Sequence, residues 1–340
     1  MDMKVGLCGF GGMGRTHAQL LQKHADVKLV AVADAEEERR QLAKDTYGVQ
    51  TWASGEEMIA AGGLDVVFVC VPTYLHAPMT IQALRAGCDV FCEKPMALNE
   101  ALCQDMIAAA DECDKALMIG QVLRFWPEYV FLKKAIDSGE YGKLHTLSMT
   151  RVGGISIGWD NWYLNEDRGG MQIFDRHIHD TDAILWMLGL PRSVYAYGVH
   201  RDPHNAGGIY HSFTQYDYGD GLVVSAEGSA DTPKGFPFTA AYRAFFADTC
   251  IEFNSAVKPT LKVYAGSEVR VPDLSVTEET LKSGLNISTG GPYLNEQCYF
   301  FDCLRRGVKP TTVTPASAKQ TIRVVKAEVE SYRARKPIML

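Results

Sequence analysis

The segment from residue 175 to residue 182, DRHIHDTD, places two histidines and three aspartates within eight positions. If this segment lies on a helix, Asp175 and His179 are one turn apart and share a face, while His177 points about 160° away from them. A histidine titrates near neutral pH and can take the proton of a hydroxyl, and a neighbouring carboxylate orients the ring and stabilises its charged form. The pair therefore has the chemistry needed to take a proton from a hydroxyl group.

Two other interpretations of this segment stay open. The first is a metal site, which the spacing disfavours, because zinc sites on helices use histidines four residues apart and that spacing here pairs a histidine with an aspartate. We therefore expect no bound metal. In the second interpretation, Asp175 caps the helix and His179 is a hydrogen-bonded histidine of the core.

A third candidate group is Lys94, which ends the strand-like run DVFCEKP. An earlier apolar run, LDVVFVCVP, ends in a similar way before Thr73. Parallel sheets bind ligands beyond the carboxyl ends of their strands, so Lys94 stands where a ligand is expected, and its ammonium group can stabilise a reacting oxygen. A surface lysine at the end of a strand is an equally good interpretation of the sequence alone.

Three glycines give a stronger signal for a cofactor. Gly9, Gly11 and Gly14 form G-x-G-x-x-G between the strand-like run KVGLC and a helical pattern, where backbone N–H groups can approach a pyrophosphate. Asp34 ends the next strand about 20 residues later, where a carboxylate accepts hydrogen bonds from ribose hydroxyls and repels a 2′-phosphate. Because Ala35 supplies no cation, we expect NAD rather than NADP. The alternative role of Asp34 is to cap the helix that follows it.

The rhythm of the apolar runs divides the chain into two parts. Up to Gln121, strand-like runs alternate with helical patterns, including helices over about 13–24 and 100–114, which predicts βαβ units and a doubly wound parallel sheet. The second part has helical patterns over about 129–138, 175–188 and 315–335, and alternating runs on both sides of YGDG, which predict a hairpin and an antiparallel sheet. We therefore expect an α/β protein with a dinucleotide-binding domain over residues 1–122 and a second domain over residues 123–340.

The composition limits the class of protein. With 46% apolar and 22% charged residues, the 340-residue chain is neither disordered nor collagen-like. Its net charge of −7 argues against nucleic acid or an anionic membrane as a partner and favours an uncharged or weakly charged small molecule. Nine cysteines without a repeated CxxC spacing indicate free thiols in a reducing compartment. No signal peptide and no apolar run of ~20 residues are present, so we expect a cytoplasmic protein.

Four motifs resemble those of the Gfo/Idh/MocA oxidoreductase family, which includes inositol dehydrogenases and glucose–fructose oxidoreductase: GFGGMGRTHA, VPTYLHAPM, EKPMALN and D-x-x-x-H-x-x-D. A family-like tail, GPYLNEQCYFFDCLRRGVKP, extends the resemblance over nearly the whole chain. The resemblance implies a Rossmann domain, a C-terminal α/β domain with a large, mostly antiparallel sheet, and a cis peptide near Lys94-Pro95. It implies that this sheet serves as an oligomer interface, so we expect a homodimer or homotetramer. It also implies a catalytic trio, which maps onto Lys94, Asp175 and His179.

These motifs also name the residues expected to contact ligands. For the cofactor they are Gly9, Phe10, Gly11, Gly12, Met13, Gly14, Asp34, Val71, Pro72, Thr73, His76, Glu93, Lys94 and Gln121. For the substrate, the catalytic trio is joined by aromatic and polar side chains of the kind that bind sugar rings: Arg124, Trp126, Asn161 and Tyr163, with His177 and Tyr293 as further candidates. Packing between the domains explains each of these added residues equally well.

The expected activity is an NAD-dependent dehydrogenase acting on a CH–OH group of a sugar, cyclitol or glycoside. One alternative is a redox-neutral oxidoreductase in which tightly bound NAD is recycled in place. The other alternative is a non-catalytic dinucleotide sensor whose second domain binds partners. The presence of Lys94, Asp175 and His179 argues against a sensor, which has no need of them.

Overall fold

Six short strands form the first of two sheets in the computed structural model, which describes residues 2–154, 156–199, 209–219, 221–274 and 290–340. They are β1 (Met3–Cys8), β2 (Val27–Ala33), β3 (Gln50–Trp52), β4 (Val66–Val69), β5 (Asp89–Glu93) and β6 (Leu117–Gly120). All neighbours pair in parallel, in the order β3-β2-β1-β4-β5-β6. The predicted doubly wound sheet is confirmed, and its order is that of a Rossmann fold.

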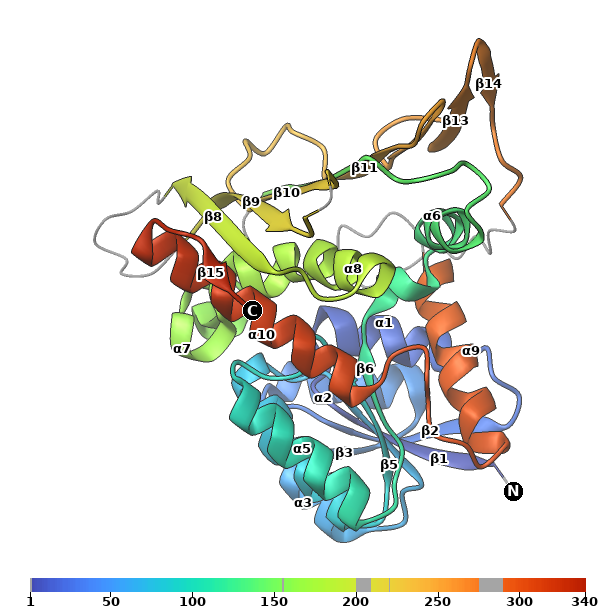
Figure 1. Ribbon diagram of the computed structural model, residues 1–340. Helices are drawn as coiled ribbons and strands as arrows, with labels where there is room; N and C mark the ends of the chain where they lie inside the picture. The colour runs from blue at the N-terminus through green and yellow to red at the C-terminus, as the bar shows by residue number, and fades with distance from the viewer. Residues whose placement is uncertain (1, 155, 200–208, 220, 275–289) are drawn as a thin grey trace. The chain divides into compact units, whose positions relative to one another are not determined.

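Helices pack on both faces of this sheet (Figure 1). They are α1 (Gly12–Leu21), α2 (Glu37–Tyr47), α3 (Gly55–Ala61), α4 (His76–Arg85), α5 (Glu100–Glu112) and α9 (Gly291–Arg305), with short 3-10 turns at Thr73–Leu75 and Val122–Phe125. Helix α4 contacts both α3 and α5, while α1 contacts α9. Residues 1–125 and 277–319 make up this first compact unit, so a segment from late in the chain completes it.

Nine strands form the sheet of the second unit, which comprises residues 126–276 and 320–340. They are β7 (Thr146–Val152), β8 (Ser193–Val199), β9 (His211–Asp217), β10 (Val223–Ser229), β11 (Thr239–Phe245), β12 (Thr249–Asn254), β13 (Leu261–Ala265), β14 (Glu268–Arg270) and β15 (Ile338–Met339). The order is β14-β13-β12-β11-β7-β10-β9-β8-β15, and only the β7–β10 pair is parallel. The mostly antiparallel sheet and the β9–β10 hairpin are confirmed, while Asp220 of the predicted turn lies outside the described residues.

Alternating burial along these strands places one face of the sheet in a core. On β9, for example, Ser212, Thr214 and Tyr216 are buried, and Phe213 between them is exposed. Helices α6 (Pro127–Ser138) and α8 (Ile178–Leu188) contact each other, and α8 also contacts β7. Shorter segments are a 3-10 turn at Trp159–Leu164 and α7 (Glu166–Gly169), and α10 (Pro315–Ala334) ends the helical part of the chain.

Several elements differ from the sequence prediction. Residues Ile173–His177 form a π-helical turn before α8, where a regular helix was expected. The short elements β3, α3, β14 and β15 were not predicted. None of the described helices combines the length and the apolar character needed to span a bilayer. The division into a cofactor domain over residues 1–122 and a substrate domain over residues 123–340 stays a prediction.

Candidate functional site

The carboxyl ends of the parallel strands bring together the residues predicted to bind the cofactor. Strands β1, β2, β4, β5 and β6 are neighbours and run in the same direction, so they end at one edge of the sheet. The predicted residues follow these ends directly: Gly9 to Gly14, Asp34, Val71 to Thr73, Lys94 and Gln121. Ligands of open α/β sheets bind at this edge.

The turn between β1 and α1 is shaped by its glycines. Gly9 has a φ of 88°, and a Cβ on Gly9 would lie 2.5 Å from the Cys70 carbonyl oxygen. A Cβ on Gly14 would lie 1.9 Å from the Gly9 carbonyl oxygen, so only glycine lets α1 approach β1 this closely. A Cβ on Gly11 would have no atom of the described chain within 4 Å apart from Gly11 itself and the residues that flank it, and no side chain there caps α1. This open space beside free N–H groups fits a dinucleotide pyrophosphate.

Both carboxylate oxygens of Asp34 are engaged. Oδ2 accepts the N–H of Phe10 at 2.7 Å, which ties Asp34 to the glycine turn, and Oδ1 accepts the N–H of Glu36 at 2.9 Å. Asp34 does not cap α2 itself, because Glu36 is the N-cap residue of that helix. The guanidinium Nη1 of Arg39 lies 3.6 Å from Oδ1. Ala35 supplies no cation, as the sequence analysis noted, but Arg39 brings one close to this carboxylate.

The buried side chain of His76 fastens the turns after β4 and β5 to each other. Its Nδ1 lies 2.7 Å from the Pro95 carbonyl oxygen, and its Nε2 lies 2.9 Å from the Val71 carbonyl oxygen. Burial lowers the pKa of His76, although both carbonyl contacts favour the charged ring, which can donate to the two oxygens at once. The Lys94–Pro95 peptide between these contacts is cis, as the resemblance implied.

Glu93 and Gln121 were both predicted to contact the cofactor, and they differ in whether their side-chain oxygens already have hydrogen-bond partners. Oε1 of Glu93 lies 2.7 Å from His17 Nε2, and Oε2 accepts the N–H of Lys94 at 3.1 Å. Gln121 is 1% exposed, and its Oε1 has no hydrogen-bond partner within the described part of the chain. A buried acceptor of this kind is costly unless a bound molecule or water satisfies it. Gln121 therefore fits a ligand contact better than Glu93 does.

The residues predicted to handle the hydroxyl proton lie in the second unit, where the π-helical turn meets α8. Turns of this type are frequent at functional sites, because the extra residue redirects the side chains around it. Asp175 and His179 are half-buried, whereas His177 is fully buried. The prediction that His177 points away from the other two agrees with this difference in exposure.

Buried polar contacts fix α8 against its neighbours. The guanidinium of Arg151 on β7 makes two hydrogen bonds of 3.0 Å to the Asp180 carboxylate, and both side chains are shielded from solvent. Two residues further along α8, Asp182 accepts a hydrogen bond through Oδ1 from the hydroxyl of Thr321 on α10 at 2.9 Å. Since contacts to charged groups are directional, they set the rotation of α8 and therefore the direction in which His179 points.

His177 belongs to this buried network rather than to a ligand site. Its Nε2 lies 3.2 Å from the Thr214 hydroxyl and 3.3 Å from a carboxylate oxygen of Glu328. Burial alone lowers the pKa of His177, but the Glu328 carboxylate more than offsets this and raises the pKa above its usual value of 6.5. The suggestion that His177 contacts the substrate is not supported, because none of its side chain reaches solvent.

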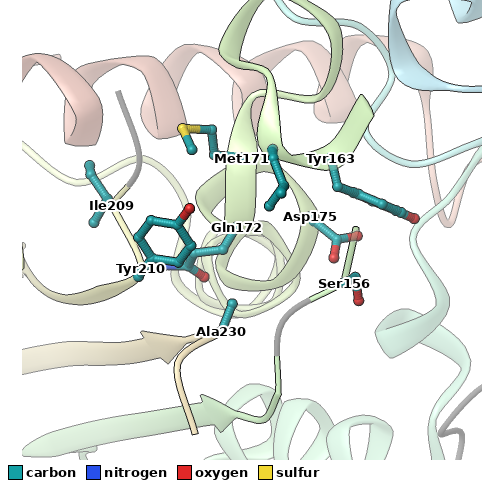
Figure 2. A pocket seen from close by; sticks show the side chains of 9 residues that line it. Ser156, Tyr163, Met171, Gln172, Asp175, Ile209, Tyr210 and Ala230 are labelled. Atoms are coloured by element: carbon teal, nitrogen blue, oxygen red, sulfur yellow. The ribbon is translucent and has the colours of Figure 1, made fainter. Parts of the chain in front are cut away.

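A pocket of the second unit that is open to solvent is lined by Asp175. The other lining residues are Ser156, Tyr163, Leu164, Met171, Gln172, Ile209, Tyr210 and Ala230. In Figure 2, the Asp175 carboxylate lies on the same side of the pocket as Tyr163 and Ser156, and Gln172 lies on the other side with Tyr210. The pocket thus combines a carboxylate, hydroxyls and an amide with apolar side chains.

Gln172 is the lining residue that the sequence analysis missed most clearly. It is 7% exposed, and its Nε2 donates to the Ser212 hydroxyl at 3.3 Å and to the Gly228 carbonyl at 3.4 Å. Its Oε1 has no hydrogen-bond partner among the residues that the structure describes. Gln172 precedes Asp175 by three positions, so helical spacing already placed the two on neighbouring parts of one face.

Of the other predicted substrate residues, only Tyr163 lines this pocket. The ring of Tyr163 stacks on that of Trp162, with centroids 3.8 Å apart. Asn161, which directly precedes Trp162, is exposed and has a φ of 51°. Trp126 is the N-cap residue of α6. Contacts of Trp126 and Asn161 with a substrate stay predictions.

Arg124 and Tyr293 belong to the first unit and are not among the residues that line this pocket. The buried Arg124 donates through Nη1 to the Thr312 carbonyl at 2.9 Å and to the Ser317 hydroxyl at 3.2 Å, which fastens a late segment of the chain. The ring of Tyr293 lies 6.4 Å from that of His17. These contacts give both residues packing roles, and their contact with a substrate stays a prediction.

All nine cysteines are free thiols. Within the described ranges, no three His, Cys, Asp or Glu side chains are grouped so as to hold a metal ion.

Comparisons with known proteins agree with this geometry. The chain is 32% identical over 189 residues to the inositol 2-dehydrogenase of Rhizobium meliloti, and 30% identical over 210 residues to the D-glucoside 3-dehydrogenase of Escherichia coli. The matched regions cover 56% and 58% of each pair of chains, so the chain spans little more than half the length of these relatives. A solved levoglucosan dehydrogenase, in complex with NADH and levoglucosan, has a TM-score of 0.86 at 21% identity, covering 100% of this chain and 99% of that chain, which shows the shared fold.

Two family models account for more than two thirds of the sequence. Residues 3–121 match the model described as an oxidoreductase family with an NAD-binding Rossmann fold, and residues 129–247 match the GFO/IDH/MocA C-terminal domain. The first model covers the glycine turn and Asp34, and the second covers Asp175 and His179. With both models matched in this order, the chain belongs to the Gfo/Idh/MocA family of oxidoreductases, and its first part is the family's NAD-binding fold.

Proposed function

We propose that this chain is an NAD-dependent oxidoreductase that transfers a hydride between nicotinamide C4 and a secondary alcohol carbon of a sugar, cyclitol or glycoside. The observation that carries this proposal is the Asp175 pocket, whose mixture of polar and apolar groups suits a compact ring bearing hydroxyls. The relatives named for inositol and D-glucosides support the same class of substrate. In this proposal, residues 1–122 bind the cofactor and residues 123–340 bind the substrate.

The proposed mechanism divides the alcohol's proton and hydride between two acceptors. NAD supplies the hydride acceptor, and His179 takes the hydroxyl proton, so that the carbinol becomes a ketone. Asp175 stabilises the charged imidazole ring, and Lys94 donates a hydrogen bond to the oxygen as it gains negative charge. General-base assistance contributes roughly 10²–10⁴ in rate and a placed donor roughly 10²–10³. That these three residues meet at one carbinol is itself part of the proposal.

Lys94→Met tests the mechanism. We expect the variant to bind NAD with nearly unchanged affinity and to lose at least ~10² in kcat, because the donor acts mainly in the transition state. Lys115→Met is the matched control, since Lys115 lies just before β6, at the opposite edge of the same sheet. Turnover of the Lys94 variant at the level of the control would remove Lys94 from the mechanism.

A panel of inositols, free hexoses and glycosides, read by NADH absorbance, tests the substrate class. Net NADH formation with at least one member is the expected result. Cofactor that survives gel filtration without net NADH release would instead assign the redox-neutral reaction, and NAD binding without any turnover would assign the sensor.

An oligomer is proposed from the outward face of the nine-stranded sheet. Large apolar side chains are exposed there on four adjacent or nearby strands: Tyr197 (50%), Phe213 (41%), Val223 (60%) and Phe245 (45%). An apolar sheet face of this kind favours burial against a second copy of the chain. We propose a homodimer or homotetramer, which light scattering after gel filtration tests. A cytoplasmic location, expected from the free thiols, stays a prediction.

A further inference from the structure

The backbone that carries Lys94 is held by a chain of buried side chains. The N–H of Lys94 donates to Glu93 Oε2 at 3.1 Å, and Glu93 Oε1 lies 2.7 Å from His17 Nε2. His17 Nδ1 in turn lies 2.9 Å from Nε2 of Gln297 on α9. His17 and Gln297 are fully buried and Glu93 is 5% exposed, so no water competes for these bonds.

The donors and acceptors of this chain match along its whole length. Gln297 Nε2 is a donor, so His17 Nδ1 must accept, and His17 Nε2 then carries the proton that faces Glu93. The other end of the amide is consistent with this direction, because Gln297 Oε1 lies 3.2 Å from His24 Nε2. The tautomer of His17 with its proton on Nε2 therefore satisfies both neighbours, and bonds aligned in one direction strengthen each other.

A second histidine holds the same segment from the other side. His76 is 1% exposed, and its contact of 2.7 Å with the Pro95 carbonyl lies one residue beyond Lys94. Its other nitrogen reaches the Val71 carbonyl, so the turn after β5 is tied to the turn after β4. The segment from Glu93 to Pro95 is thus fixed at its N–H by one chain of contacts and at its carbonyl by another.

We propose that His17 and Gln297, acting through Glu93, and His76, acting through the Pro95 carbonyl, are positioning residues for Lys94. The proposal rests on the proposed catalytic role of Lys94. It gives Glu93 and His76 a task in addition to the cofactor contact predicted for them, through the partners that both Glu93 oxygens and both ring nitrogens of His76 have inside the first unit.

The size of the expected effect follows from the geometry of catalysis. A displacement of a reacting group by about 1 Å can lower the rate by ~10². Loss of the contact to His17 frees one oxygen of Glu93, and the carboxylate that fixes the Lys94 N–H can then rotate. We therefore expect kcat to fall by ~10–10², with KM for NAD changed by less than ~3-fold, because the glycine turn and Asp34 are untouched.

Three variants separate positioning from packing. His17→Leu removes both hydrogen bonds of the ring. His17→Gln keeps an amide that can donate to Glu93 and accept from Gln297, and we expect it to recover most of kcat. Phe301→Leu is the matched control: Phe301 lies one turn after Gln297 on α9, is fully buried and packs on Phe68, but makes no polar contact with the segment from Glu93 to Pro95.

Two readouts are needed on the full-length protein. The first is kcat with an alcohol substrate and with the same substrate deuterated at the carbinol carbon, where His17→Leu should show a lower kcat and a larger isotope effect than Phe301→Leu. The second is hydrogen exchange of the Lys94 amide, which should lose at least ~10-fold of its protection in His17→Leu and keep it in His17→Gln. Exchange is measured whether or not a substrate is known.

The outcomes are distinguishable. An inactive wild-type protein that binds NAD would count against the proposed function, while the exchange data would still decide whether His17 holds the Lys94 amide. An active wild-type protein whose His17→Leu variant keeps the kcat and the Lys94 protection of Phe301→Leu would overturn the positioning role. Failure of His17→Gln to recover more than His17→Leu would overturn it as well.

Discussion

Replacing Asp34 by serine tests how the first unit selects between NAD and NADP. Asp34 is 8% exposed, and its carboxylate accepts the Phe10 N–H and lies 3.6 Å from the Arg39 guanidinium. A 2′-phosphate placed at this carboxylate brings two like charges to about 4 Å, which costs ~1–4 kcal/mol for effective dielectric constants between ~80 and ~20. Serine removes that repulsion and frees Arg39 to pair with the phosphate. We therefore expect the ratio of kcat/KM for NAD to that for NADP to fall by ~10–10³.

The same substitution should weaken the binding of NAD itself. The Phe10 N–H loses a charged acceptor, and a serine hydroxyl replaces it only in part. Hydrogen bonds to charged groups contribute about 1.5–3 kcal/mol, so a partial loss of about 1–2 kcal/mol raises the Kd for NAD by ~5–30-fold. A gain in NADP use accompanied by this loss would identify the carboxylate as the selecting group.

Calorimetric titration with each dinucleotide, together with initial rates, measures both effects. Asp45→Ser removes the same charge from the last turn of α2, where Asp45 bonds only Gln41 among the contacts described, and it should leave the ratio unchanged. The double variant Asp34→Ser/Arg39→Ser should lose most of the NADP gain. A ratio within twofold of the wild-type value, in an Asp34→Ser protein of unchanged Tm, would refute the assignment of Asp34 to the ribose.

Two further predictions concern the buried network that fixes α8. Arg151→Met should lower the free energy of unfolding, measured with urea, by about 3–5 kcal/mol, because it leaves the fully buried Asp180 carboxylate without its partner. Asp180→Asn in the same background should recover part of this free energy. A loss below about 1 kcal/mol would contradict the role given to this ion pair. The pKa of His177 is raised by Glu328 against the effect of burial, so its stabilising contribution is complete below pH 6.5 and is lost as the pH rises through the raised value. The difference in unfolding free energy between the wild type and His177→Gln should therefore shrink between pH 6 and pH 9, and a difference that grows with pH would rule out this sign.

Local patterns in the sequence were sufficient to predict the parallel sheet and the cofactor edge. The G-x-G-x-x-G spacing reflects close backbone approaches at Gly9 and Gly14, which only one residue type permits. Period-two alternation likewise predicted β9 and β10. The prediction of one regular helix over residues 175–188 was wrong at its start, where the chain forms a π-helical turn. Arg176 and His177 of this turn are hydrogen-bonded to distant strands, and helical periodicity in the sequence does not reveal such contacts.

Residues that are far apart in the sequence limited the prediction of the site. The lining of the Asp175 pocket includes Ile209 and Tyr210, which lie far from Asp175 in the sequence and belong to no recognisable motif. Likewise, Gln297 meets His17 across 280 positions. The amphipathic pattern of a helix indicates which of its faces is buried, but it does not indicate which distant residue a glutamine on that face will contact.

The need for a helix such as α9, however, follows from the strand order. Right-handed crossovers from β1 to β2 and from β4 to β5 run in opposite directions along the sheet, so α1 and α4 cover opposite faces. The face of β4 and β5 on the α1 side is then left without a crossover helix of its own, although Phe68 and Phe91 there are fully buried. Phe300 of α9 packs on both rings, at 6.2 Å and 5.7 Å. A doubly wound sheet that carries aromatic side chains on this face therefore requires a cover from elsewhere in the chain, and the same helix that supplies it brings Gln297 to His17.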